Sequence, residues 1–154
     1  MTHSTKKIDE IFDILNKKCS ESKVQKKHAC LFQNDKNLTV CCNSNDRSIY
    51  TAIYKNPIHG IHAEVNCLYT YLKNHKLFNK HIDYIRKKTK KIIVYVTKSN
   101  YGNSKPCQHC INMLKYYGLK KIYYTDDKCQ IIKENIQTII TDHVSEGNLN
   151  NIYN

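Results

Sequence analysis

The chain has 154 residues, enough for a single domain spanning 1–154 that buries its own core. It carries 25 Lys and Arg against 13 Asp and Glu, a formal net charge of +12. No apolar run approaches the roughly 18 residues that cross a bilayer, which excludes a transmembrane helix and a membrane partner. A soluble protein is expected.

The eight Cys are irregularly spaced, and no hydrophobic signal precedes them. This pattern predicts a cytoplasmic protein in a reducing compartment, without a disulfide framework. Most of the Cys lie in apolar or strand-like runs and are expected to be small buried residues. That group comprises Cys30, Cys41, Cys42, Cys67 and Cys129, whereas Cys19 has no predicted role.

The positive charge is compatible with nucleic-acid binding, because phosphates bind basic surfaces. The same field would attract a phosphorylated mononucleotide. However, the chain is rich in Lys, Asn, Ile and Tyr and has only two Arg, as an AT-rich coding sequence would produce whatever the function. Both explanations stay open.

The first elements in chain order are a helix and a hairpin. Residues 1–5 are expected to be a loose terminus. Ile8, Ile11, Phe12 and Leu15 then predict an amphipathic helix that ends near residues 17–20. Two apolar segments, 28–32 and 38–42, flank a polar turn and predict a β-hairpin. A loop over 43–60 follows.

The middle of the chain predicts two further elements. An apolar face formed by residues 61, 65, 68, 69 and 72 predicts a helix that starts near Gly60–Ile61. Residues 73–90 are highly charged and are expected to hold another helix around His81–Arg86. The continuous apolar run 92–96 predicts a central strand buried on both faces.

Pro106 is expected as the first residue of a helix that Gly118 stops. Residues 121–124 predict a strand. The short turn at 126–128 then permits only an antiparallel neighbour over 129–132. The tail 134–144 is mixed, and 147–154 is expected to be frayed.

Two motifs carry the chemistry: His62-Ala63-Glu64 and Pro106-Cys107-Gln108-His109-Cys110. One imidazole, His62, and two thiolates, Cys107 and Cys110, supply three Zn²⁺ ligands and leave the fourth position open for a water. Zn²⁺ lowers the pKa of that water, and Glu64 can shuttle the protons. This combination is the signature of hydrolytic base deaminases. A structural zinc site or an inactive copy is the alternative.

These motifs and their order resemble the cytidine/deoxycytidylate deaminase superfamily, over about residues 28–132. The resemblance implies an α/β fold: a three-layer α/β/α sandwich around a five-stranded mixed sheet. It implies zinc ligands at His62, Cys107 and Cys110, and a catalytic Glu64. It also implies that the backbone amides of Ala63 and Cys107 hold the water or the base, and that Asn43 contacts a sugar. Ala63 and Asn43 are thus the predicted substrate contacts.

The resemblance gives two conflicting indications of the substrate. The antiparallel last pair of strands is similar to that of the free-nucleoside deaminases. The His-Ala-Glu triplet instead resembles the nucleotide and polynucleotide branches, and the nucleoside enzymes' sugar motif is absent from residues 43–46.

Three hypotheses follow. The first, which we favour, is a zinc-dependent deaminase of a cytosine-type nucleoside or nucleotide. The second is a deaminase of a base within single-stranded DNA or RNA, with a groove lined by Lys98, Tyr101, Lys105 and His109. The third is an inactive, zinc-stabilised binding module. A homo-oligomer is expected from the resemblance alone.

Overall fold

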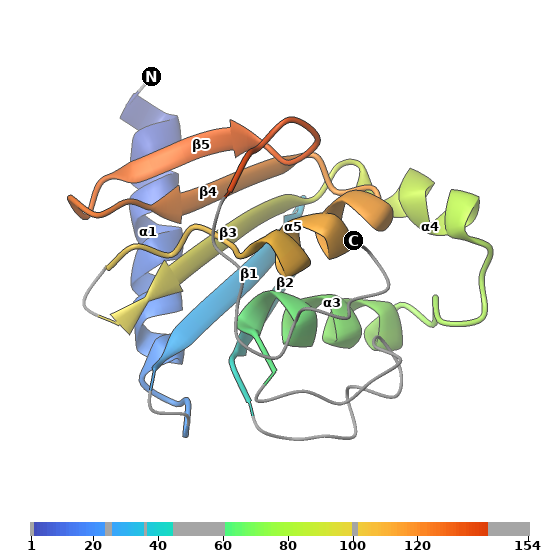
Figure 1. The fold of residues 1–154 in the computed structure, drawn as a ribbon, viewed down its shortest axis with the longest axis horizontal. Coiled ribbons are helices and arrows are strands. Elements are labelled where there is room, and N and C mark those ends of the chain that lie inside the picture. Colours follow the sequence, from blue (N-terminus) through green and yellow to red (C-terminus); the bar gives the residue numbers. More distant parts are fainter. Residues whose placement is uncertain (1, 24–25, 36, 45–60, 100–101, 142–154) are drawn as a thin grey trace.

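The computed structural model describes residues 2–23, 26–35, 37–44, 61–99 and 102–141. Their centre is a five-stranded mixed sheet with strand order β2-β1-β3-β4-β5 (Figure 1). The strands are β1 (His28–Asn34), β2 (Asn37–Cys42), β3 (Ile93–Lys98), β4 (Lys121–Thr125) and β5 (Ile131–Asn135). Only β3 and β4 pair in parallel; the other neighbouring pairs are antiparallel. The predicted sheet is confirmed.

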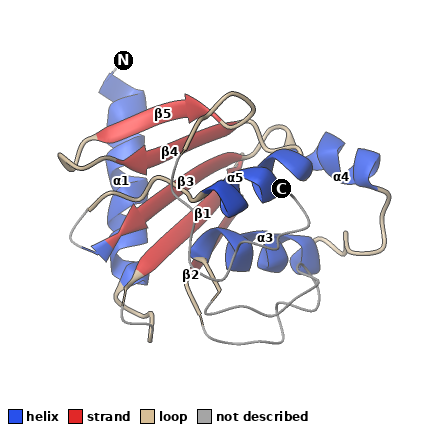
Figure 2. Ribbon diagram, viewed as in Figure 1, coloured by secondary structure: helices blue, strands red, loops and turns tan. Residues whose placement is uncertain are grey.

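Helices cover both faces of this sheet, which completes the predicted α/β/α arrangement (Figures 1 and 2). One face carries α3 (Ala63–Asn74) and α5 (Gln108–Tyr116), with α4 (Ile82–Thr89) beside them. The other face carries α1 (Thr2–Cys19). None of the described helices is long and apolar enough to cross a membrane.

Strand β3 divides the core into two layers, because alternate side chains of a strand point to opposite faces. Val94 and Val96 are buried in the layer beneath α3 and α5. Tyr95 is buried in the layer beneath α1, where its ring contacts those of Phe12 and Tyr123. The prediction of a strand covered on both faces is confirmed.

The first helix begins earlier than its sequence indicates. Ile11, Phe12 and Leu15 are buried against the sheet, as the periodicity predicts. However, the helix starts at Thr2, so the expected loose terminus over 1–5 is wrong for residues 2–5. A polar first turn has no hydrophobic periodicity from which a start can be read. Cys19, which had no predicted role, is buried in this same layer.

The last two strands form the predicted antiparallel hairpin. Cys129 lies in its turn with φ 62° and is exposed, so the prediction that it is buried is wrong. Its N–H donates to the carbonyl of Asp126 (3.1 Å), which makes it a turn residue, and β5 begins two residues later. The expected mixed tail supplies Ile136 and Ile139 to the main core.

Candidate metal centre

Two helix N-termini bring the motif residues together. His62 is the N-cap of α3 and Cys107 is the N-cap of α5, both with extended backbone (ψ 151° and ψ 166°). The helices begin at Ala63 and Gln108, so the predicted starts at Gly60–Ile61 and at Pro106 are early by two or three residues. Sequence signals locate a helix end only to within a residue or two, so residues just before the N-cap can be assigned to the helix by mistake.

Backbone pairing fixes the position of His62. Its neighbour Ile61 forms a β-bridge with Ser44, two residues after the end of β2, and each N–H donates to the other's carbonyl. The side chain of Ile61 is buried in the main core. The imidazole is thus held between the end of the hairpin and the first turn of α3.

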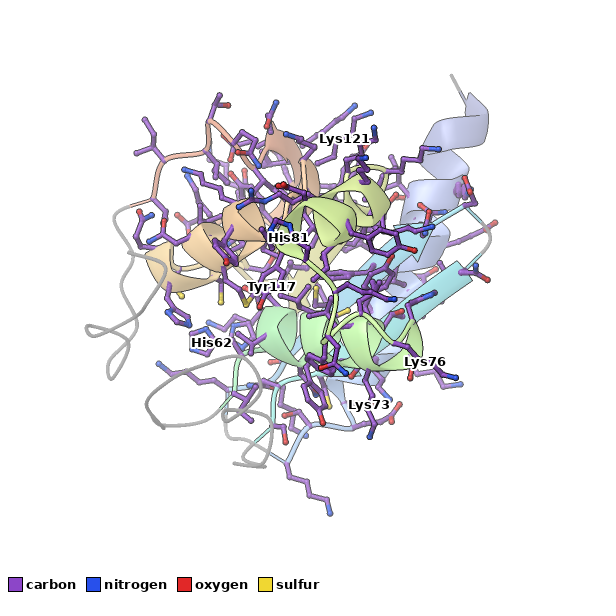
Figure 3. The ribbon with its side chains drawn as sticks, turned by 90° about the vertical axis from the view of Figure 1, so that its right-hand side faces the viewer. His62, Lys73, Lys76, His81, Tyr117 and Lys121 are labelled. Carbon is purple, nitrogen blue, oxygen red and sulfur yellow. The ribbon has the colours of Figure 1, made fainter. Side chains whose placement is uncertain are left out.

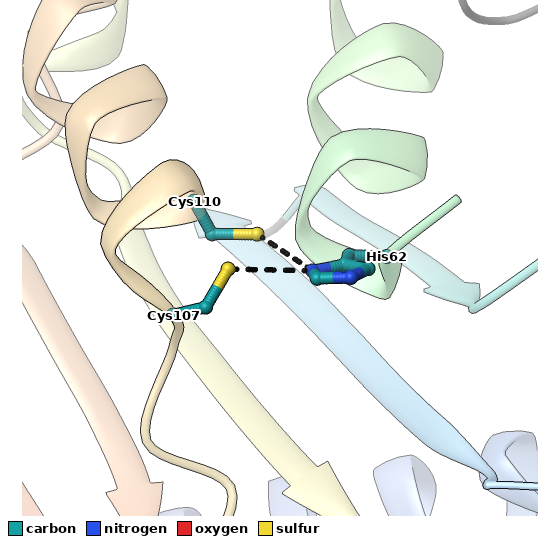
Figure 4. A group of neighbouring side chains, drawn as sticks. All are labelled: His62, Cys107 and Cys110. Carbon is teal, nitrogen blue, oxygen red and sulfur yellow. Dashed lines mark hydrogen bonds between the residues drawn. The ribbon is translucent and has the colours of Figure 1, made fainter. Parts of the chain in front are cut away.

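The three predicted ligand atoms converge on one point (Figure 4). His62 Nδ1 lies 3.2 Å from Cys110 Sγ and 3.5 Å from Cys107 Sγ. All three atoms lie within 4.8 Å of one another. Zn–S and Zn–N bonds at the tetrahedral angle would separate S and N by about 3.5 Å, so the cluster matches the size of a zinc site.

The pKa shifts in this cluster favour the deprotonated form of Cys107 and the protonated forms of Cys110 and His62. The hydrogen bond from Cys110, the largest influence, lowers the pKa of Cys107 to about 2, aided by His62 and opposed by burial. Burial, followed by the Cys107 thiolate, raises the pKa of Cys110 well above its ordinary value. The pKa of His62 is raised: burial opposes the charged ring, but the hydrogen bond and charge of Cys107 outweigh it. A bound metal would draw the remaining protons off these ligands.

Glu64 lies in the first turn of α3, next to this cluster, and is only 5% exposed. Burial raises the pKa of its carboxyl group, while the nearby His62 opposes that shift. Its side chain is within hydrogen-bonding reach of the Cys110 thiol. A carboxyl group so placed can both accept and donate a proton at the metal cluster.

A buried hydroxyl that the sequence did not single out holds the cysteine segment in place. Ser104 Oγ donates to the carbonyl of Val96 in β3 (2.8 Å) and accepts from the N–H of Thr125 in β4 (2.8 Å). The N–H of Ser104 donates to the carbonyl of Thr125 (2.8 Å), and Thr125 Oγ1 donates to the carbonyl of Gly102. The segment leading to Cys107 is thereby tied to the carboxyl ends of the two parallel strands.

Asn43, one predicted substrate contact, is buried among local partners. Its Oδ1 accepts from Ser22 Oγ (2.6 Å) and from the N–H of His28 (3.0 Å), and its Nδ2 donates to the carbonyl of Lys26. These bonds join the end of β2 to the start of β1. Ala63, the other predicted contact, is the first residue of α3 and is fully buried. Contact of either residue with a substrate stays a prediction.

One of the four residues predicted to line a groove for a polynucleotide substrate is buried. His109 is 2% exposed, and burial lowers the pKa of its imidazole to about 4. Its side chain belongs to the interior, so the prediction that it lines a surface groove is wrong. Lys98 and Lys105 are half-buried, whereas Tyr101 lies outside the described residues.

The chain is similar to known proteins in sequence and in fold. The family described as "Cytidine and deoxycytidylate deaminase zinc-binding region" matches residues 6–126. No curated protein gives a match. Among solved structures, a cytidine deaminase from Burkholderia pseudomallei superposes with a TM-score of 0.58 at 14% identity, over 86% of this chain and 94% of that one. That likeness extends the shared fold to most of both chains. Since the family match covers most of the sequence and contains all the residues of a zinc-sized cluster, the chain belongs to the cytidine and deoxycytidylate deaminase zinc-binding family.

Proposed function

We propose that the protein is a zinc-dependent hydrolytic deaminase of a cytosine-type nucleoside or nucleotide. The observation that carries the proposal is the buried carboxyl of Glu64 beside the cluster of His62, Cys107 and Cys110. A structural zinc site needs four ligands and no buried acid, whereas a hydrolytic site needs three ligands and a proton carrier.

In this proposal the chain's own residues divide the work. His62, Cys107 and Cys110 hold Zn²⁺, which supplies an activated water at neutral pH. Glu64 takes a proton from the attacking water and delivers a proton to the departing amine. Burial favours this role, because it raises the carboxyl pKa toward the operating pH and so makes both proton transfers accessible. The helix N-termini at Ala63 and Gln108 present N–H groups and positive dipole ends toward negative charge that develops there.

The proposed substrate class is supported by the family and by the sheet. The family's description names cytidine and deoxycytidylate deaminases, and the antiparallel β4–β5 pair resembles the nucleoside branch. The structural relative from Burkholderia pseudomallei is likewise a cytidine deaminase. The His-Ala-Glu triplet resembles that of the nucleotide branch, so the proposal includes phosphorylated nucleosides as substrates.

The test compares wild type with Glu64→Gln, both zinc-loaded. Ammonia release and product mass are measured with cytidine, deoxycytidine, CMP, dCMP, adenosine, guanine, single-stranded DNA and tRNA. Wild type should convert a cytosine nucleoside or nucleotide, and Glu64→Gln should lose on the order of 10²–10⁴ in rate while keeping its zinc. Glu10→Gln, an exposed carboxylate of α1, is the matched control and should be fully active.

Two other outcomes would replace the proposal. Conversion of a base only within DNA or tRNA would make the protein a polynucleotide deaminase. If no substrate is converted and zinc removal unfolds both proteins equally, the chain is a zinc-stabilised binding module.

A further inference from the structure

The positive charge of the chain is concentrated in one segment. Residues 73–91 contain eight Lys or Arg and one acid, Asp83. About one-eighth of the chain therefore carries seven of its twelve net positive charges. A coding bias toward Lys would raise the charge along the whole chain, so it does not account for this concentration.

This basic segment 73–91 forms an exposed surface at one end of the molecule. It runs from the end of α3 through α4 to the start of β3 (Figure 1). All seven of its Lys are exposed, and Arg86 is half-buried. Among the described residues none of these seven Lys forms a salt bridge, because Asp83 faces His81 (3.6 Å) and Arg86 (3.8 Å) instead.

Aromatic rings lie among these cations. Phe78, Tyr84 and Tyr116 are 40%, 44% and 43% exposed. Lys80 Nζ and Lys88 Nζ lie 5.8 Å and 5.4 Å from the centre of the Tyr84 ring. Arg86 Cζ lies 5.2 Å from that of Tyr116. Proteins that bind single-stranded nucleic acids combine exposed aromatic rings with flexible cations. The bases stack on the rings, and the phosphates bind the cations.

Helix electrostatics explain only part of this charge. Lys73 lies in the last turn of α3, and Arg86, Lys87 and Lys88 lie in the last turn of α4, where cations complement the helix dipole. Lys90 is the C-cap of α4 and also complements its dipole, whereas Lys76, Lys80 and Lys91 lie outside these helix ends. The dipole also gives no reason for the exposed rings.

The surface does not suit a membrane. An interfacial helix needs an apolar stripe that enters the lipid. Helix α4 turns Ile85 and Thr89 inward and exposes Asp83, Tyr84, Lys87 and Lys88. An anionic polymer that carries stacking bases fits these residues better than a lipid surface does.

The surface is also remote from the metal cluster. His62 precedes α3 and Lys73 lies near its other end, as Figure 3 shows. The 12 residues of α3 span about 18 Å. We infer that the basic segment 73–91, with Tyr84 and Tyr116, is a binding surface for single-stranded nucleic acid. The inference goes beyond the proposed deaminase and stands without it, since it uses no residue of the metal cluster.

The test measures binding of a fluorescein-labelled oligo(dT) and an oligo(U) of about 20 nucleotides by anisotropy, at several salt concentrations. The zinc-loaded full chain is compared with two quadruple Lys→Gln variants that remove the same charge from exposed positions. One changes the surface: Lys76, Lys80, Lys87 and Lys88. The matched control changes α1 and two distant turns: Lys7, Lys17, Lys23 and Lys128.

The surface variant should bind at least about tenfold more weakly near 0.1 M salt, with a salt slope shallower by up to about 3. The control variant should stay within about threefold of wild type. Tyr84→Ala should weaken oligonucleotide binding by about tenfold and leave the salt slope unchanged. The same substitution should not alter binding of heparin, which has charge but no bases.

Three results would overturn the inference. The two quadruple variants could weaken binding equally, which would mean that only net charge matters. Tyr84→Ala could leave oligonucleotide binding unchanged, which would make the surface a general polyanion site. Vesicles containing phosphatidylserine could bind through this surface while oligonucleotides do not, which would assign it to a membrane.

Discussion

At the scale of single residues, the hydroxyl of Ser104 links three parts of the protein whose relative positions must be fixed for the metal cluster to form. It contacts β3, β4 and the segment that carries Cys107, and it is 4% exposed. Removing it would leave the carbonyl of Val96 and the N–H of Thr125 without this buried partner.

We therefore expect Ser104→Ala to lower the free energy of unfolding by about 1–3 kcal/mol, the cost of unsatisfied buried groups. Zinc affinity should fall as well, because the loop before Cys107 gains freedom. Urea denaturation and zinc titration measure the two effects. Ser20→Ala removes an exposed serine hydroxyl that donates to a carbonyl and should change neither; an equal loss in both variants would contradict this account.

A second residue, His28, makes stability depend on pH. Burial lowers the pKa of its imidazole to about 4, from an ordinary value of 6.5, and nearby positive groups add to the shift. Between these values the unfolded chain binds a proton that the folded chain does not, so stability is lost as pH falls from 6.5 to 4. His28→Gln should show a shallower loss over this window in denaturation at a series of pH values. If His75→Gln, at an exposed site, flattens the curve as much, His28 is not the source.

At the scale of elements, α4 closes the C-terminal end of α5. Arg86 Nε donates to the carbonyl of Tyr116 (2.8 Å), and Thr89 Oγ1 donates to that of Tyr117. Directly after these residues Gly118 adopts φ +87°, and a Cβ there would lie 2.8 Å from Cγ of Arg86 and 3.1 Å from its Cα. The turn thus needs glycine both for its backbone conformation and for the close approach of α4.

Gly118→Ala should consequently destabilise the protein by more than about 1 kcal/mol, since the left-handed conformation alone costs a non-glycine residue about that much. Gly102→Ala is the matched control. Its Cβ would meet nothing closer than 3.4 Å, and no left-handed φ is required there. Thermal unfolding of the two variants side by side tests the difference; similar losses would show that the Arg86 contact does not constrain the turn.

At this scale the sequence could predict single elements, but not the contacts between elements that are distant in the chain. The hairpin, the α3 face and the β4–β5 turn follow from periodicity and loop length, which are local properties. The helix within 73–90 was expected only around His81–Arg86, and it extends to Thr89. Its capping of α5 depends on residues about 30 positions apart, which no local pattern reveals. Ser104 was overlooked for the same reason, whereas His62, Glu64, Cys107 and Cys110 could be predicted as site residues from the spacing within each motif.

At the scale of the whole molecule, the metal would connect two helices that lie side by side on the sheet. Ligand binding to the folded state alone adds stability in proportion to the logarithm of ligand excess. Zinc at about 100 times its Kd should thus raise the free energy of unfolding by about 2.7 kcal/mol. Calorimetry before and after chelation measures this. Cys110→Ser should lose most of the gain, and a gain that survives in that variant would place zinc elsewhere.

The order of the strands was not predicted, because pairing between distant strands leaves no local trace. The covering of both faces could be predicted from the apolar run 92–96 and from the family resemblance. The charge of residues 73–91 could be read from the sequence, but their position could not: the fold places them at one end of the molecule, beyond α3 and α5 (Figure 1).

The 44 residues between His62 and Cys107, which are 45 positions apart, have a kinetic consequence. They include β3 and α4, so the ligands meet only after the chain has closed a long loop and α5 has packed across the sheet. We expect the contacts through the metal to form after the rate-limiting barrier of folding, and interactions absent from that barrier act on the unfolding rate. Zinc would then leave the refolding rate almost unchanged and act by slowing unfolding, so that the metal governs how long a folded molecule lasts more than how quickly one is made.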